Sequence, residues 1–204
     1  MPRLGAVWQT AEPAAIATQE GPAGRDWRLF WPIETPGIGG GAKTQRASQV
    51  AAPESQRIRE LAAYWESKRA GRFAPRRADI DPAEIRAHMP TLMMVDVLPD
   101  GDYRYRLMGT ELAEGRGRTA TGQRVTELMA DRPSALRQLK ERFDSVVAAR
   151  APVYSRGEVY WETSADDMRM FECGYFPLSD DGETVNIILA ELIIFWPGHE
   201  EAAG

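Results

Sequence analysis

The last third of the sequence contains three apolar runs, VYSRGEVYW (153–161), MRMFECGYFPL (168–178) and TVNIILAELIIFW (184–196). Each run is rich in the β-branched and aromatic residues that strands favour. The turn sequence SDDG (179–182) joins the second run to the third, and a Pro-Gly pair ends the third. Because consecutive strands with short connections pair antiparallel, this stretch predicts a three-stranded meander.

Two more strands and several helices precede this meander. Residues 92–98 and 103–110 flank a Pro-Asp-Gly-Asp turn, which indicates a hairpin. Glycines between residues 111 and 129 leave room for short helices only. Residues 133–150 repeat apolar side chains at helical spacing, with Arg142 among the polar residues of the opposite side. This order predicts an α+β fold, a five-stranded antiparallel sheet with helices packed on one face.

The residues before the hairpin contain a low-complexity segment and a helix. Residues 1–53 are rich in Ala, Gly, Pro, Thr and Gln, so they bury little apolar surface and we expect them to be disordered. The exception is an aromatic patch at residues 27–33. This patch either docks on the domain itself or is a linear motif for a partner protein. From residue 54 the pattern becomes helical, and the expected domain spans residues 54–197, followed by a tail at 198–204.

Two helices open the expected domain. Ile58, Leu61 and Trp65 recur at helical spacing, and Gly71 follows where a helix commonly ends, which predicts a helix over residues 54–68. The pair Asp81-Pro82 is typical of a helix start, so we expect a second, short helix that ends before Pro90.

The composition of the chain argues against several classes of function. A formal net charge of −5 argues against a nucleic-acid surface, which needs clustered positive charge. Cys173 is the one cysteine, so neither an intramolecular disulfide nor a multi-cysteine metal site can form. No apolar run approaches the roughly 20 residues of a membrane span. The N-terminus lacks the pattern of a secretory signal, so we expect a cytoplasmic protein without membrane contact.

A series of short motifs runs in order from the leading helix to the last turn. These motifs are YW (64–65), PRRADIDP (75–82), YRLMGT (105–110), TG (121–122) and FPLSDDG (176–182). In the order and spacing of the motifs, the chain from about Leu61 to Phe195 resembles the PAS domain family. It is most similar to the stand-alone PAS-like proteins that are common in alphaproteobacteria.

The resemblance implies a bacterial module of signal transduction that senses a small molecule or binds a signalling protein. PAS domains hold ligands between the sheet and the helices that cover it, and they often form a homodimer through an N-terminal helix. Here that helix would be residues 54–68. A partner protein would dock on the outer face of the sheet.

The sequence assigns no catalytic residue, no metal ligand and no particular cofactor. Flavin-binding PAS domains place a reactive cysteine in an Asn-Cys-Arg motif, whereas Cys173 lies in a predicted strand. Haem-binding PAS domains use a histidine of the long helix, and residues 133–150 contain none. We therefore interpret His88 as a helix-end residue and His199 as part of the tail.

Some residues remain candidates for contact with a ligand; they are Arg106, Tyr105, Arg118, Glu172 and Tyr175. Arg106 either forms a salt bridge with Asp96 or Glu111, or clamps a carboxylate or phosphate with help from Arg118. Glu172 and Glu191 interrupt apolar strands, and each either pairs with an arginine, lies exposed, or is a buried carboxylate with a raised pKa. The tyrosines either pack the sheet or line a ligand cavity.

The sequence thus favours a non-catalytic sensory or regulatory domain that binds a small ligand or a partner protein. A small enzyme of the isomerase or hydrolase type is one alternative. It would gain support from Glu172 or Glu191 buried beside a tyrosine in a large pocket. A pure interaction scaffold with a filled core is the other.

Overall fold

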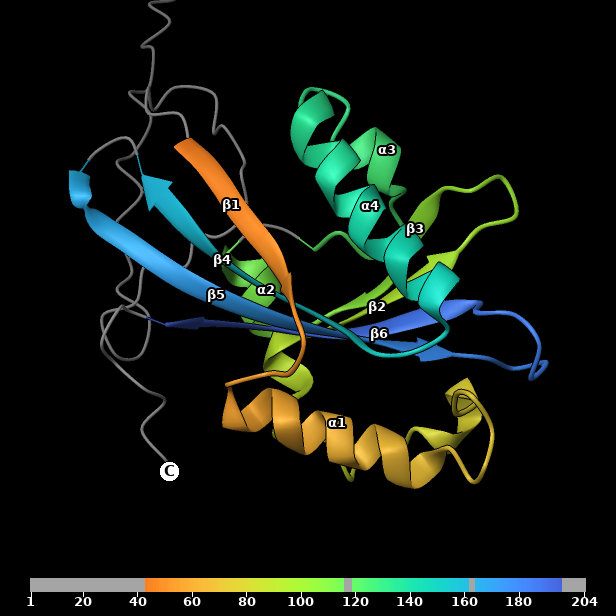
Figure 1. The fold of residues 1–204 in the computed structure, drawn as a ribbon. Coiled ribbons are helices and arrows are strands. Elements are labelled where there is room, and N and C mark those ends of the chain that lie inside the picture. Colours follow the sequence, from red (N-terminus) through yellow and green to blue (C-terminus); the bar gives the residue numbers. More distant parts are fainter. Residues whose placement is uncertain (1–42, 116–118, 162–163, 196–204) are drawn as a thin grey trace, which may run out of the picture.

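The computed structural model describes residues 43–115, 119–161 and 164–195, and they form one antiparallel sheet of six strands (Figure 1). The strands are, in sheet order, β1 (Lys43–Val50), β4 (Val153–Trp161), β5 (Ser164–Leu178), β6 (Ile187–Phe195), β2 (Leu92–Val97) and β3 (Tyr103–Met108). The α+β class, the hairpin and the closing meander are therefore confirmed. The predicted number of five strands is wrong by one.

The sixth strand, β1, comes from the segment that was expected to be disordered. Residues 47–50 pair in register with residues 154–157 of β4, so Gln49 lies opposite Ser155. Neither the composition nor the alternation of the sequence KTQRASQV marks it as a strand, because its main stabilising contact is the backbone pairing with β4. The predictions for residues 1–42, including the aromatic patch, and for the tail at 198–204 lie outside the described residues.

The helices differ in length and regularity. They are α1 (Gln56–Lys68), α2 (Thr110–Gly115), α3 (Val125–Leu128), α4 (Pro133–Ala149) and the 3-10 turns Arg77–Asp79 and Met89–Thr91. The regular helix predicted after Asp81 does not form. Instead, Glu84 N donates to Asp81 O, and His88 N donates to Ile85 O. Each of these bonds joins residues three positions apart, as in successive turns. Pro90 lies inside the following 3-10 turn rather than beyond the segment.

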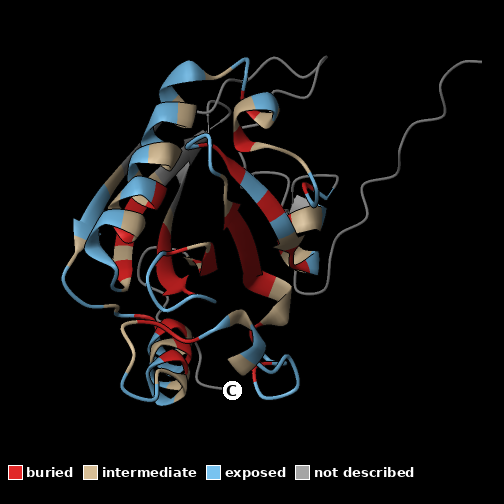
Figure 2. Ribbon diagram, turned by 90° about the vertical axis from the view of Figure 1, so that its right-hand side faces the viewer, coloured by how far each residue is buried: buried red, intermediate tan, exposed pale blue. Residues whose placement is uncertain are grey.

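Helices cover both faces of the sheet, which corrects the prediction of helices on one face (Figures 1 and 2). We call the face under α4 the inner face; its core residues include Met93, Val95, Tyr105, Val153, Cys173, Tyr175, Ile188 and Ala190. We call the face under α1 the outer face; its core residues include Leu92, Met94, Phe176, Leu178, Ile187, Leu189 and Ile193. Both faces of the central strands are buried, so these strands are apolar almost without interruption.

The first helix is fixed to the outer face by its apolar side. Ile58, Leu61 and Trp65 are at most 2% exposed, and burial of each contributes about 1.5–3 kcal/mol. The indole nitrogen of Trp65 also donates to the carbonyl oxygen of Pro177 at 2.8 Å. The side chain of Ile58 packs directly against Gly174 of β5, where an added Cβ would lie 2.7 Å from Cγ2 of Ile58. The central part of the outer face is thus occupied by α1 of the same chain.

Candidate functional site

The inner face of the sheet carries aromatic rings that connect three elements. The ring of Phe143 on α4 lies 4.9 Å from the ring of Tyr103 on β3 and 6.1 Å from that of Tyr175 on β5. Tyr105 is fully buried on the same face. These rings make the part of the inner face near β3 a packed core, with little room for a ligand.

Polar atoms collect on the inner face toward strand β4. Ser155 of β4 lies directly opposite Cys173 of β5, and Val153 lies opposite Tyr175. Ser155 is 3% exposed, and its hydroxyl oxygen makes no hydrogen bond of normal geometry among the described residues, although the Tyr175 phenol lies near enough to interact with it. Since a buried hydroxyl without a well-formed hydrogen bond is costly, such a group commonly marks a place that water or a ligand fills.

Burial changes the acidity of the two groups next to Ser155. It raises the pKa of the Cys173 thiol to about 12, so the thiol stays protonated and unreactive at neutral pH. It also raises the pKa of the Tyr175 phenol well above its ordinary value. Both groups are therefore neutral, and this region offers hydrogen-bond donors rather than a nucleophile.

The structure brings together only part of the set of candidate residues. Tyr105 and Tyr175 both lie on the inner face. Arg106 lies on the opposite side of β3 with its side chain 50% exposed, and its Nε donates to Asp96 at 2.5 Å. The salt bridge that was one of the two interpretations of Arg106 is thus present. Arg118 lies outside the described residues.

Glu172 is buried on the outer face, where it holds the start of α1. Its carboxylate accepts hydrogen bonds from the backbone amides of Glu54 at 2.8 Å and Ser55 at 3.1 Å. Ser55 caps α1 in turn, and Arg156 of β4 forms an ion pair with Glu54. Of the three interpretations of Glu172, namely an arginine partner, an exposed position and a buried carboxylate, the structure shows the buried one, with backbone amides as its partners.

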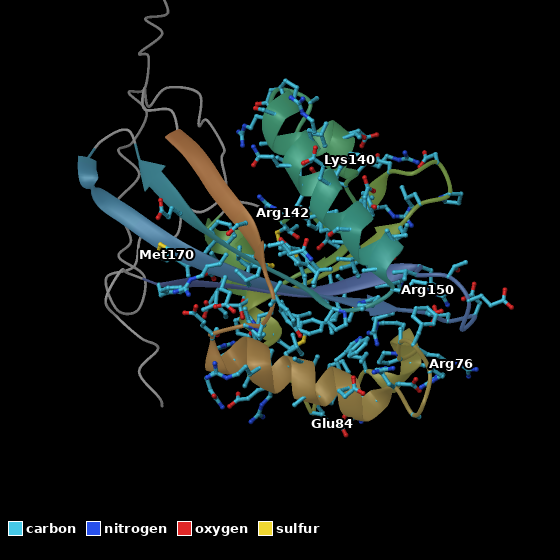
Figure 3. The ribbon with its side chains drawn as sticks, viewed as in Figure 1. Arg76, Glu84, Lys140, Arg142, Arg150 and Met170 are labelled. Atoms are coloured by element: carbon cyan, nitrogen blue, oxygen red, sulfur yellow. The ribbon has the colours of Figure 1, made fainter. Side chains whose placement is uncertain are left out.

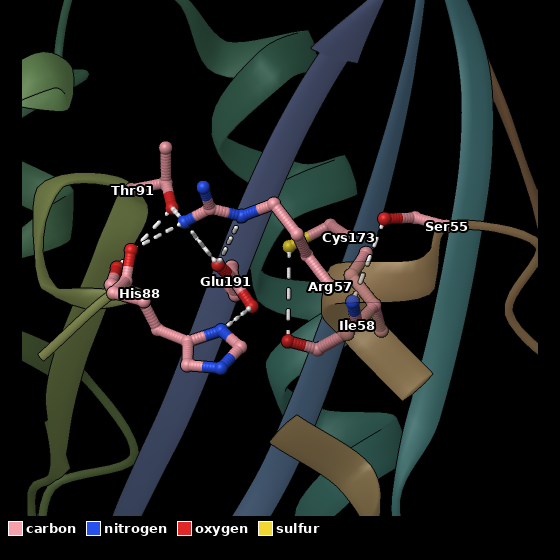
Figure 4. A network of polar contacts seen from close by, with 9 residues as sticks. Ser55, Arg57, Ile58, His88, Thr91, Cys173 and Glu191 are labelled. Atoms are coloured by element: carbon pink, nitrogen blue, oxygen red, sulfur yellow. Dashed lines mark hydrogen bonds and ion pairs between the residues drawn. The ribbon is translucent and has the colours of Figure 1, made fainter. Parts of the chain in front are cut away.

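Glu191 lies at the centre of a second buried network on the outer face (Figure 4). One carboxylate oxygen accepts from Arg57 of α1 at 3.1 Å and from the Thr91 hydroxyl at 2.9 Å. The other lies 2.9 Å from Nδ1 of His88. His88 and Thr91 come from the turns before β2, so this carboxylate connects α1, those turns and β6. Its oxygens are fully engaged, which indicates a structural role rather than acid–base catalysis.

Two residues of the polar region, Ser155 and Arg142, were missed by sequence reasoning. Ser155 alternates with the outward residues Tyr154 and Arg156, and this alternation could have placed it inside. Arg142 was assigned to the polar side of its helix. In the structure it is only partly exposed, and its charge acts on Cys173 and Tyr175.

A family model described as PAS domain matches residues 53–192, which is more than half of the chain. The chain therefore belongs to the PAS domain family, as its motifs predicted, and this family suggests a sensory or regulatory module. A search of curated proteins and a search of solved structures each found no match.

Two negative observations apply to the described ranges. Within residues 43–115, 119–161 and 164–195, His, Cys, Asp and Glu side chains form no group of three or more that could hold a metal ion. No helix in the same ranges has the length and apolar character needed to cross a bilayer.

Proposed function

We propose that the chain is a non-catalytic sensory or regulatory module of the cytoplasm that binds a small molecule at the inner face of its sheet, beside Ser155. The observation that supports the proposal is the buried Ser155 hydroxyl, which makes no hydrogen bond of normal geometry to a described residue, although the Tyr175 phenol lies near enough to interact with it. The adjacent Leu192 and the α4 residues Leu139 and Val147 are only partly buried. Together they offer an apolar surface around a polar point, as ligand sites commonly do.

Cys173 provides a direct test, because it is the one cysteine and lies opposite Ser155. A thiol reagent reaches a 1% exposed side chain only when the domain opens locally. We expect a metabolite fraction of a bacterial extract to slow the labelling of Cys173 in the full chain. A ligand whose free concentration is about ten times its dissociation constant should slow the labelling about tenfold. Labelling is followed by mass spectrometry or by released thionitrobenzoate.

The matched control moves the cysteine away from the inner face. A chain with Cys173→Ser and Glu183→Cys carries its thiol on an exposed turn, where a ligand beside Ser155 should leave the labelling rate unchanged. Equal slowing of both chains would mean that the extract consumes the reagent. An unchanged rate at Cys173, with no metabolite found on the intact chain by native mass spectrometry, would contradict the proposal.

Binding of a signalling protein is the second part of the proposal. Because α1 occupies the central outer face, a partner would contact the exposed side of α1 or the sheet edges rather than that face. The scaffold alternative differs from sensing in requiring no ligand, so the labelling experiment separates the two.

Dimerisation through α1 also belongs to the proposal. The apolar side of α1 is used within the chain, so a dimer contact would involve its exposed residues, among them Arg59, Glu60 and Glu66. We expect light scattering coupled to size exclusion to give twice the mass of the chain. Reversing the charge of Arg59 and Glu60 together should lower the dimer's stability. A monomer at all protein concentrations would contradict this prediction.

A further inference from the structure

The inner face of the sheet continues beyond Ser155 and Cys173, toward the end where strand β1 lies. Two residues further along the strands, the next row of opposed residues consists of Ala47 of β1, Gly157 of β4, Phe171 of β5 and Ile194 of β6. Side chains two positions apart on a strand point to the same face, so these four residues also belong to the inner face. We call them the distal row.

The distal row lies outside the part of the sheet that α4 packs against. The cluster under α4 includes Cys173 but, within the described ranges, neither Phe171 nor any residue of β1. Figure 3 shows this separation, because the labelled Met170, which precedes Phe171 on β5, lies to the left of Lys140 and Arg142 of α4. The helix that covers the rest of the inner face therefore does not cover the distal row.

Phe171 is nevertheless buried. Its exposure is 1%, although among the described residues it joins neither the cluster under α4 nor the cluster under α1. On the side of the sheet edge its neighbours in the row are Gly157, which has no side chain, and Ala47, which has a single methyl group. Since these neighbours are too short to cover a phenyl ring, the row needs a large apolar side chain above it.

The sequence provides large apolar side chains a short distance before β1. Residues 27–33 read WRLFWPI, and nine residues, 34–42, separate them from Lys43, where β1 begins. An extended connection of nine residues spans up to about 30 Å. Two strand spacings, from β1 to β5, amount to only about 10 Å. The connection also includes four glycines, which permit a chain reversal. The aromatic patch can therefore reach the distal row.

We propose that the aromatic patch of residues 27–33 docks on the inner face of its own chain, where Trp27 and Trp31 cover Phe171 and Gly157 of the distal row. In an extended segment, Trp27 and Trp31 point to the same side, together with Leu29. This inference decides between the two interpretations of the patch that the sequence leaves open. It does not rest on the proposed function, which concerns the neighbouring row at Ser155.

Two single-cysteine reporters in the full chain test the docking, each combined with Cys173→Ser. Ala47→Cys places a thiol in the distal row, and Ser48→Cys places one on the opposite face of β1, where Ser48 is exposed. We expect the double substitution Trp27→Ser and Trp31→Ser to speed thiol labelling at position 47 at least about tenfold and to leave the rate at position 48 unchanged. Each thiol is compared with itself, so differences in intrinsic reactivity cancel.

The double substitution Val7→Ser and Trp8→Ser is the matched control, since it removes an apolar pair that precedes the patch in the sequence. It should leave the labelling rates at both positions unchanged. Far-UV circular dichroism and the urea unfolding midpoint check that each chain is folded. Should the double variant of the patch unfold, Trp27→Ser and Trp31→Ser are tested singly, and each should speed labelling at position 47 by a smaller factor.

Three outcomes would overturn the inference. Equal labelling at position 47 with and without Trp27 and Trp31 would leave the patch available to a partner protein. Acceleration by Val7→Ser with Trp8→Ser as large as that by the patch variant would show that the patch has no special role. Protection that increases with the concentration of the chain would assign the cover to a second copy. The proposed function is judged separately, by the extract experiment on Cys173.

Discussion

Replacing Glu191 with alanine is expected to lower the free energy of unfolding by about 3 kcal/mol. Glu191 is fully buried, and its carboxylate holds Arg57, Thr91 and His88. Its removal leaves these donors without their acceptor. Arg57 is 36% exposed and can turn toward water, which keeps the loss at the lower end of the range for broken buried ion pairs. Urea unfolding followed by tryptophan fluorescence measures the change, since Trp65, one of the six tryptophans, is 2% exposed and becomes exposed on unfolding.

Glu183→Ala is the control for this substitution, because Glu183 lies exposed in the turn before β6. It should change the free energy of unfolding by no more than about 0.5 kcal/mol. The Glu191 network would lose its assigned role in holding α1 if Glu191→Ala cost less than about 1 kcal/mol. Limited proteolysis adds a structural readout, because a loosened α1 should be cut earlier than the strands.

Replacing Gly109 with alanine is expected to destabilise the domain by about 3 kcal/mol or more. An added Cβ would lie 2.3 Å from the carbonyl oxygens of Met89 and Pro90. These atoms belong to backbone, so they cannot move aside as a flexible side chain can. The amide of Gly109 also donates to Leu92 O at 2.7 Å, which fixes the chain at this close approach. The unfolding midpoint in urea is the measurement.

Gly101→Ala separates steric contact from the general effect of replacing a glycine. Gly101 has a positive φ of 76° but open space around its Cα, so its substitution should cost only about 1 kcal/mol. Equal losses at the two positions would show that contact with the turn at residues 89–91 does not matter.

Most of the fold could be predicted from the periodicity of apolar residues in the sequence. The apolar stripe of Ile58, Leu61 and Trp65 and the alternation around Tyr103 and Tyr105 depend on local geometry, which the sequence records directly. Strand β1 was missed because its strand character comes from pairing with β4, about a hundred residues away. The second face of helices was missed because periodicity shows which side of α1 is buried but not which face of the sheet it covers.

The residues of the candidate site were likewise predictable only in part. Tyr105 and Tyr175 could be recognised as inward residues because they alternate with other residues of their strands. Glu172 and Glu191 looked alike in sequence, and only the fold shows that the first binds backbone amides and the second binds Arg57. Arg142 lies at the edge of the apolar stripe of α4. At that position the helical periodicity of 100° per residue does not determine whether the side chain faces water or the core.

Strand β1 also affects where the chain can be shortened. The family match starts at residue 53, whereas β1 ends at Val50, so a fragment trimmed to the match would lack that strand. The backbone amides and carbonyls of β4 that now pair with β1 would then form a bare sheet edge, open to pairing with other chains. Aggregation of such a fragment would result from the missing strand β1 and should not be interpreted as a loss of signalling. Fragments for binding studies should therefore begin before Lys43.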